Sequence, residues 1–122
     1  MPTGNTLTGV AERIRSGEPE TVVIKEFIDN WKVTRSPMAF ESPPDMTGSP
    51  IIDTWVAGAA EALAFKLSMP PPAWSEAPER FLPEPVFLRN SPGGRMTELL
   101  ETPSYFRRRN LFCGRSHLSD AD

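Results

Sequence analysis

The amino-acid sequence predicts an all-α fold, an irregular bundle of about five helices with a long proline-rich arm. Apolar residues recur at helical spacing in several segments of the chain. Serine-proline and threonine-proline pairs, which favour the first turn of a helix, precede some of these segments. Fourteen prolines and eight glycines break the chain between them. With 122 residues, 39% of them hydrophobic, the chain is expected to form a single helical domain, 1–122, around one core.

The first third of the chain shows two helical patterns. Residues 7–14 place apolar side chains on one face of a short helix, and residues 16–17 end it. A second helix begins at residues 18–19, where a proline suits the first turn, and its wide apolar stripe extends to Trp31. Two helices joined by a short connection are therefore expected here.

The middle of the chain is predicted to supply the central helix. Residues 35–50 contain too many prolines for a helix and are expected to form an ordered proline-rich connection. Ser49 and Pro50 provide an N-cap and a first-turn proline for a helix over residues 51–68. Alanine and glycine have small side chains, so neighbouring elements can approach part of this helix closely. Charged residues interrupt the segment, which indicates a core helix rather than a membrane span.

The last part of the chain combines a proline-rich arm with two short helices. Residues 69–94 contain too many prolines for a long helix, yet they are apolar enough to wrap irregularly on the core. Residues 95–101 are predicted as a fourth helix. Thr102 as N-cap and Pro103 as first helical residue predict a fifth, with arginines in its last turn. Strand pairing of residues 111–113 is left open.

The charge balance argues against a general affinity for nucleic acid. The formal net charge is −3, whereas displacing counterions from phosphates requires a basic field. Residues 103–119 are the exception, because they contain four arginines and no acidic residue. The sequence therefore predicts a local basic patch on an acidic body.

The cysteine content and the N-terminus indicate the compartment. Cys113 is the only cysteine, which excludes an intrachain disulfide and favours a reducing environment. The first residues lack the basic start and apolar run of a signal peptide. We therefore expect a cytoplasmic location.

The arginines are the first candidate binding residues. Guanidinium groups bind carboxylates and phosphates, so Arg107, Arg108, Arg109 and Arg115 are candidates for contact with a partner. Cations in the last turn of a helix also stabilise it without any ligand, and this alternative stays open. Successive helical residues point in different directions, so at most two of the triplet can share one target, with Arg115 as a possible third contact.

The residue types needed for catalysis or metal binding do not assemble in this sequence. Cys113 and His117 are four residues apart, but Gly114 stands between them and a structural zinc site needs four ligands. A Cys-His nucleophilic pair is disfavoured because the segment around Cys113 is apolar and buried thiols are inert. We therefore expect no enzyme activity, no metal and no cofactor.

Two C-terminal segments carry a resemblance to a known family. Residues 72–82 place a tryptophan in a proline-rich stretch, and residues 102–112 contain a Thr-Pro-x-x-Phe-Arg-Arg-Arg motif, with Leu118 and Ser119 near the end. This half of the chain resembles small bacterial antitoxin-like proteins that are paired with nucleotidyltransferase-like toxins. The resemblance implies an inhibitor that neutralises a partner toxin by direct contact.

Four aromatic residues are candidate anchors for such a contact. They are Phe81, Phe87, Tyr105 and Phe106, and core packing is the alternative for each of them. The resulting prediction is a non-catalytic protein-binding module. Alternatives are a small ligand-binding protein or an enzyme of unknown substrate, and a nucleic-acid accessory protein that uses the patch at residues 107–109. Self-association is also left open.

Overall fold

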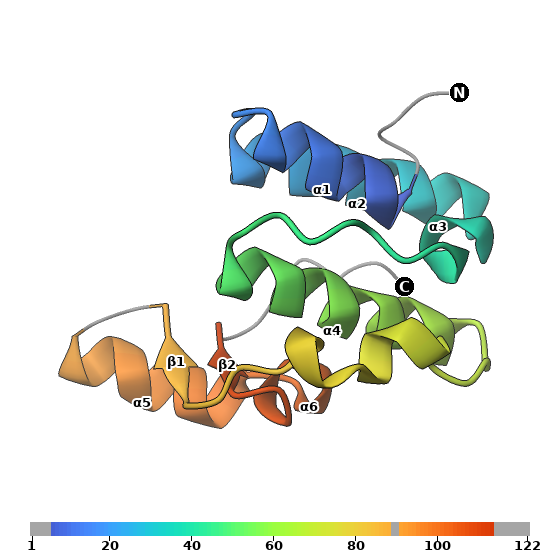
Figure 1. Ribbon diagram of the computed structural model, residues 1–122. Helices are drawn as coiled ribbons and strands as arrows, with labels where there is room; N and C mark the ends of the chain where they lie inside the picture. The colour runs from blue at the N-terminus through green and yellow to red at the C-terminus, as the bar shows by residue number, and fades with distance from the viewer. Residues whose placement is uncertain (1–5, 89–90, 114–122) are drawn as a thin grey trace.

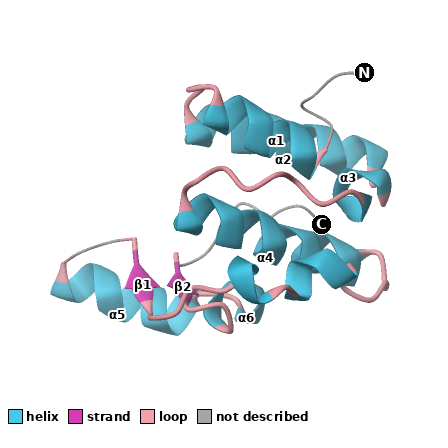
Figure 2. Cartoon of the chain, viewed as in Figure 1, coloured by secondary structure: helices cyan, strands magenta, loops and turns pink. Residues whose placement is uncertain are grey.

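The computed structural model, which describes residues 6–88 and 91–113, confirms the all-α fold (Figures 1 and 2). The described part contains six α-helices, two single turns of 3-10 helix and one pair of very short strands. In chain order they are α1 (Leu7–Arg15), α2 (Glu20–Thr34), α3 (Met38–Glu41), α4 (Pro50–Lys66), η2 (Ala73–Glu76), η3 (Pro78–Arg80), β1 (Val86–Phe87), α5 (Pro92–Glu101), α6 (Ser104–Arg107) and β2 (Leu111–Phe112). No helix in the described residues has the length and apolar character needed to cross a membrane.

Helix α4 is the central element, as the sequence predicts. It lies between the α1–α2 pair on one side and α5, α6 and the strand pair on the other (Figure 1). Its start is also confirmed, because the Ser49 hydroxyl accepts a hydrogen bond from the Ile52 amide at 3.4 Å and Pro50 occupies the first turn. Alanines along most of its length are buried, so its neighbours pack close to the helix axis.

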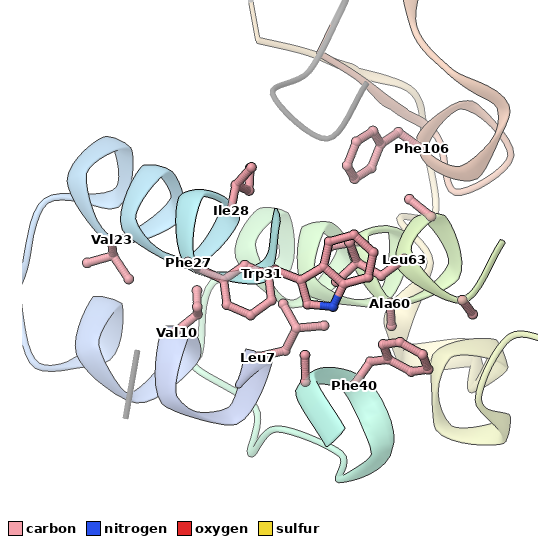
Figure 3. Packing of buried hydrophobic residues seen from close by; sticks show 14 of the residues in the cluster. Leu7, Val10, Val23, Phe27, Ile28, Trp31, Phe40, Ala60, Leu63 and Phe106 are labelled. Atoms are coloured by element: carbon pink, nitrogen blue, oxygen red, sulfur yellow. The ribbon is translucent and has the colours of Figure 1, made fainter. Parts of the chain in front are cut away.

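The main core lies between α1, α2, α3 and α4 (Figure 3). Its largest side chain is Trp31, whose indole nitrogen donates to the Ser36 carbonyl at 3.1 Å. Residues 35–50 were predicted to form a connection without a helix. The structure differs, because this connection contains α3. Pro37 precedes this short helix and does not interrupt it, and burial of Phe40 holds the turn on the core.

The proline-rich arm is irregular and packs on α4, as predicted. The indole nitrogen of Trp74 donates to the Phe40 carbonyl at 2.9 Å, and the buried guanidinium of Arg80 donates to the Pro44 carbonyl at 2.5 Å. The arm ends earlier than expected, because α5 begins at Pro92. The Ser91 hydroxyl accepts from the Gly94 amide at 3.0 Å and caps this helix, so the helix includes Gly93 and Gly94, which were predicted to belong to the arm.

The predicted helix start at Thr102 is wrong. Thr102 ends α5, and its hydroxyl donates to the Glu98 carbonyl at 2.5 Å instead of capping the next helix. Helix α6 begins after Pro103 and has only four residues, so Arg107 lies in its last turn and the next two arginines follow it. The open question about residues 111–113 is also settled, because β2 pairs with β1 in parallel.

Candidate functional site

The last arginine of the triplet is part of the interior. The Arg109 side chain is completely buried. Its Nη1 atom donates to Glu61 Oε1 at 2.6 Å and to the Tyr105 carbonyl at 2.7 Å, and Nη2 donates to the Ser75 carbonyl at 2.9 Å. The guanidinium carbon also lies 4.8 Å from the ring centre of Phe81. A side chain held in this way fastens the C-terminal segment to α4 and to the arm.

The middle arginine completes an ion cluster. Arg108 Nε donates to Glu61 Oε1 at 2.9 Å, and its Nη2 forms an ion pair with Glu76. We call Arg108, Arg109, Glu61 and Glu76 the ion cluster. Burial raises the pKa of the Glu61 carboxyl, but hydrogen bonds from the two arginines outweigh that effect and lower it overall. The cluster has two positive and two negative charges and is therefore neutral as a whole.

The first arginine is exposed and has a different partner. Arg107 Nη2 donates to the Leu99 carbonyl at 2.7 Å, near the C-terminal end of α5. Arg115, the fourth member of the predicted basic patch, lies outside the described residues. Because carboxylates compensate two of the three arginines of the triplet, less positive charge is available to phosphates than the sequence indicates.

Two of the predicted contact residues are not available for contact in this structure. Phe106 is fully buried and packs on Gly58, where a methyl group would lie only 2.5 Å from the phenyl ring. Arg109 is fully buried as well. Both predictions are corrected to structural roles, because α4 and the arm supply long-range partners for these side chains.

The other three aromatic candidates are half-buried and lie in two places. Tyr105 stacks edge-to-face on Phe106, with ring centres 4.9 Å apart, and Phe81 lies against the guanidinium groups of the ion cluster. Phe87 belongs to the strand pair and stacks on Phe112 at 4.7 Å. Tyr105 and Phe81 are therefore near the arginines, whereas Phe87 makes its contact elsewhere.

An exposed groove lies where the C-terminal half of α4 meets α6. Its volume is about 210 Å³, and it is lined by Glu61, Phe65, Met69, Pro71, Ser104 and Tyr105. We call this site the α4–α6 groove. Phe65 is 81% exposed although it is a large apolar residue of the central helix. Sequence reasoning missed Phe65 as a site residue, because no pattern described above distinguishes it from a core residue of the predicted helix.

Helix α5 presents a second exposed apolar face. Met96, Leu99 and Leu100 are spaced as neighbours on one side of the helix, and all three are exposed. Among the residues of this helix whose burial is described, the buried side chain is the polar Glu98. The sequence left self-association open, and this face does not decide it.

The structure describes only some of the residues that were considered as metal ligands. Within residues 6–88 and 91–113, no group of three or more histidine, cysteine, aspartate or glutamate side chains is arranged to hold a metal ion. Cys113 is half-buried, and His117 lies outside the described residues. Burial, together with the charge of Glu98, raises the pKa of the Cys113 thiol to about 11.

The raised pKa predicts that the Cys113 thiol reacts slowly with alkylating reagents. The thiolate is the reactive form, so we expect native Cys113 to react with iodoacetamide at pH 8 roughly a hundredfold more slowly than an unfolded control. The rate should increase about tenfold per pH unit until the pH approaches 11. Mass spectrometry of timed samples measures this rate. Rapid alkylation at pH 8 in the folded protein would contradict the burial and the raised pKa of this thiol.

The fold and the groove define the class of protein. It is a small irregular all-α domain whose C-terminal segment is fastened to the central helix and forms an exposed groove with it. Comparisons with protein-family models, with curated proteins and with solved structures found no match to this chain.

Proposed function

We propose that the protein is a non-catalytic protein-binding module, an antitoxin-like inhibitor that neutralises a cytoplasmic partner toxin by direct contact through the α4–α6 groove. The observation that carries the proposal is the exposure of Phe65 beside Met69 and Tyr105 in one concave site. Aromatic residues and methionine are enriched at protein interfaces, and aromatic residues supply many of the side chains that dominate binding energy. Water contact with this much apolar surface is unfavourable, and a partner would remove it.

The charges near the groove favour a protein over a nucleic acid. Nucleic-acid binding requires several cations that are free to contact phosphates. In the described chain, Arg108 and Arg109 are paired with carboxylates instead. A protein partner can use the apolar walls of the groove, which phosphates cannot.

Affinity purification of the tagged protein from its own host tests the proposal. Phe65→Ser removes the exposed ring at little cost to folding, and Val33→Ser is the matched control because Val33 is 84% exposed on α2, across α4 from α6 (Figure 1). A stoichiometric protein should co-elute with wild type and with Val33→Ser. Its recovery with Phe65→Ser should fall at least about fivefold, the loss typical of an interface residue worth ~1 kcal/mol.

Growth assays test the inhibitory part of the proposal. The captured protein, expressed alone, should arrest growth, and co-expression of wild type but not of Phe65→Ser should relieve the arrest. Full recovery of the partner with Phe65→Ser would overturn the assignment of the groove. Co-elution of nucleic acid that is sensitive to salt and is lost in Arg107→Glu would favour the accessory-protein alternative instead.

A further inference from the structure

We propose that the α4–α6 groove receives an arginine side chain of the partner protein. This inference rests on the proposed function, and it adds the chemical identity of the group that the groove recognises. Three properties of the described site support it, namely the walls of the groove, its hydrogen-bonding atoms and its charge.

The walls suit a long side chain with a flat end. Phe65 and Tyr105 supply aromatic rings, and Met69 and Pro71 supply further apolar surface. Aromatic rings attract guanidinium groups through cation–π contacts, and arginine stacks on them more readily than lysine does. The groove volume of about 210 Å³ has room for one long side chain but not for a whole helix, which is about 10 Å wide.

The polar atoms of the groove are able to accept hydrogen bonds. Both arginines of the ion cluster bind Oε1 of Glu61, so within the described residues the other carboxylate oxygen, Oε2, takes no hydrogen bond. Ser104 and Tyr105, whose hydroxyl groups can also accept hydrogen bonds, line the same groove. Arginine offers a planar fork of donors and no acceptor, so it can satisfy such a set. An apolar side chain would cover Oε2 and leave it without a donor, which is unfavourable.

The charge of the groove does not repel an arginine. The six lining residues include one carboxylate and no lysine, arginine or histidine. Arg108 and Arg109 are balanced within the neutral ion cluster, and the chain as a whole carries a net charge of −3. The neighbouring arginines are therefore compensated and do not repel a further cation, and the only long-range attraction is that of the net negative chain.

Titration with short peptides followed by NMR tests the proposal. The probe is a capped pentapeptide with a central arginine between serine and glycine residues, and the matched peptides carry citrulline or leucine at that position. Citrulline keeps the shape of arginine but has no charge. We expect the arginine peptide to shift the aromatic signals of Phe65 and Tyr105 with a Kd of about 1 to 10 mM, and the other two peptides to bind at least about fivefold more weakly.

Variants locate the binding. Phe65→Ser should weaken binding of the arginine peptide about two- to fivefold, as expected for loss of a cation–π contact, and Val33→Ser should not change it. Neither variant disturbs the ion cluster, whereas a substitution of Glu61 would leave the buried Arg109 without its carboxylate. Equal or tighter binding of the leucine peptide overturns the proposal. The absence of any shift with the arginine peptide overturns it as well.

Competition with the captured partner separates this inference from the proposed function. The arginine peptide should elute the partner from the immobilised protein, and the citrulline peptide should not. If only the leucine peptide elutes a partner whose capture depends on Phe65, the protein-binding function stands and the arginine assignment fails. If capture does not depend on Phe65, the proposed function of the groove fails first.

Discussion

Replacement of Arg109 by methionine is expected to lower the free energy of unfolding by about 3 kcal/mol, the cost typical of breaking a buried, hydrogen-bonded ion pair. Methionine fills a similar volume, so the loss comes from polar groups rather than from a cavity. The substitution removes the hydrogen bonds to Glu61, to the Ser75 carbonyl and to the Tyr105 carbonyl. Buried carbonyl groups left without donors are the main cost.

Chemical denaturation followed by circular dichroism measures this effect, and Arg107→Met is the matched control. Arg107 is the exposed neighbour in the triplet, and within the described residues its side chain donates one hydrogen bond, to the Leu99 carbonyl. Its replacement should change the free energy of unfolding by less than about 1 kcal/mol. Arg109→Lys keeps the charge but cannot reproduce the forked contacts, so it should also destabilise. An effect of Arg109→Met no larger than that of the control would refute the structural role of this side chain.

Replacement of Gly58 by alanine is expected to destabilise the protein by about 2 to 3 kcal/mol. The added methyl group would lie 2.5 Å from Phe106 Cδ1 and 3.1 Å from the Tyr105 carbonyl oxygen. Phe106 is fully buried, so its ring cannot move away without disturbing the core, and the carbonyl belongs to the backbone of α6. Alanine favours a helix over glycine by ~1 kcal/mol, so the measured loss is net of that gain.

A second glycine and a second substitution complete this experiment. Gly93 lies in α5 with no atom near the position of an added methyl group, so Gly93→Ala should be neutral or stabilising by up to about 1 kcal/mol. Phe106→Leu in the Gly58→Ala background should recover part of the loss, because a smaller side chain relieves the overlap. Additive effects of the two substitutions would show that Gly58 and Phe106 are not coupled.

Local capping rules predicted a helix start correctly where no neighbouring element bound the hydroxyl group of the capping residue. Ser49 and Pro50 start α4 as expected, because the serine hydroxyl has the free amide of Ile52 in reach. The same rule failed at Thr102, whose hydroxyl donates back to the Glu98 carbonyl at the end of α5. The predicted start of the fourth helix at residue 95 is too late, because Pro92 and the two glycines after it are typical breakers, although the Ser91 cap satisfies a first-turn amide of the helix.

The candidate site could be predicted only in part. The sequence indicated Tyr105 and the arginine triplet as contact residues, and the structure places Tyr105 in the α4–α6 groove. The sequence could not indicate that Arg109 is buried, because Glu61, its partner, is 48 residues away in the chain. Exposure of Phe65 likewise depends on which elements cover the end of α4.

The sequence by itself determined the helical class, the identity of the central helix and the wrapping of the proline-rich arm. These features follow from periodicity, helix caps and breakers, which act over a few residues. Only the tertiary structure decided which arginines are buried, which aromatic rings remain exposed and where the groove lies. Those outcomes depend on contacts between α4, the arm and α6, which are far apart in sequence, and local patterns carry no information about which distant side chains meet.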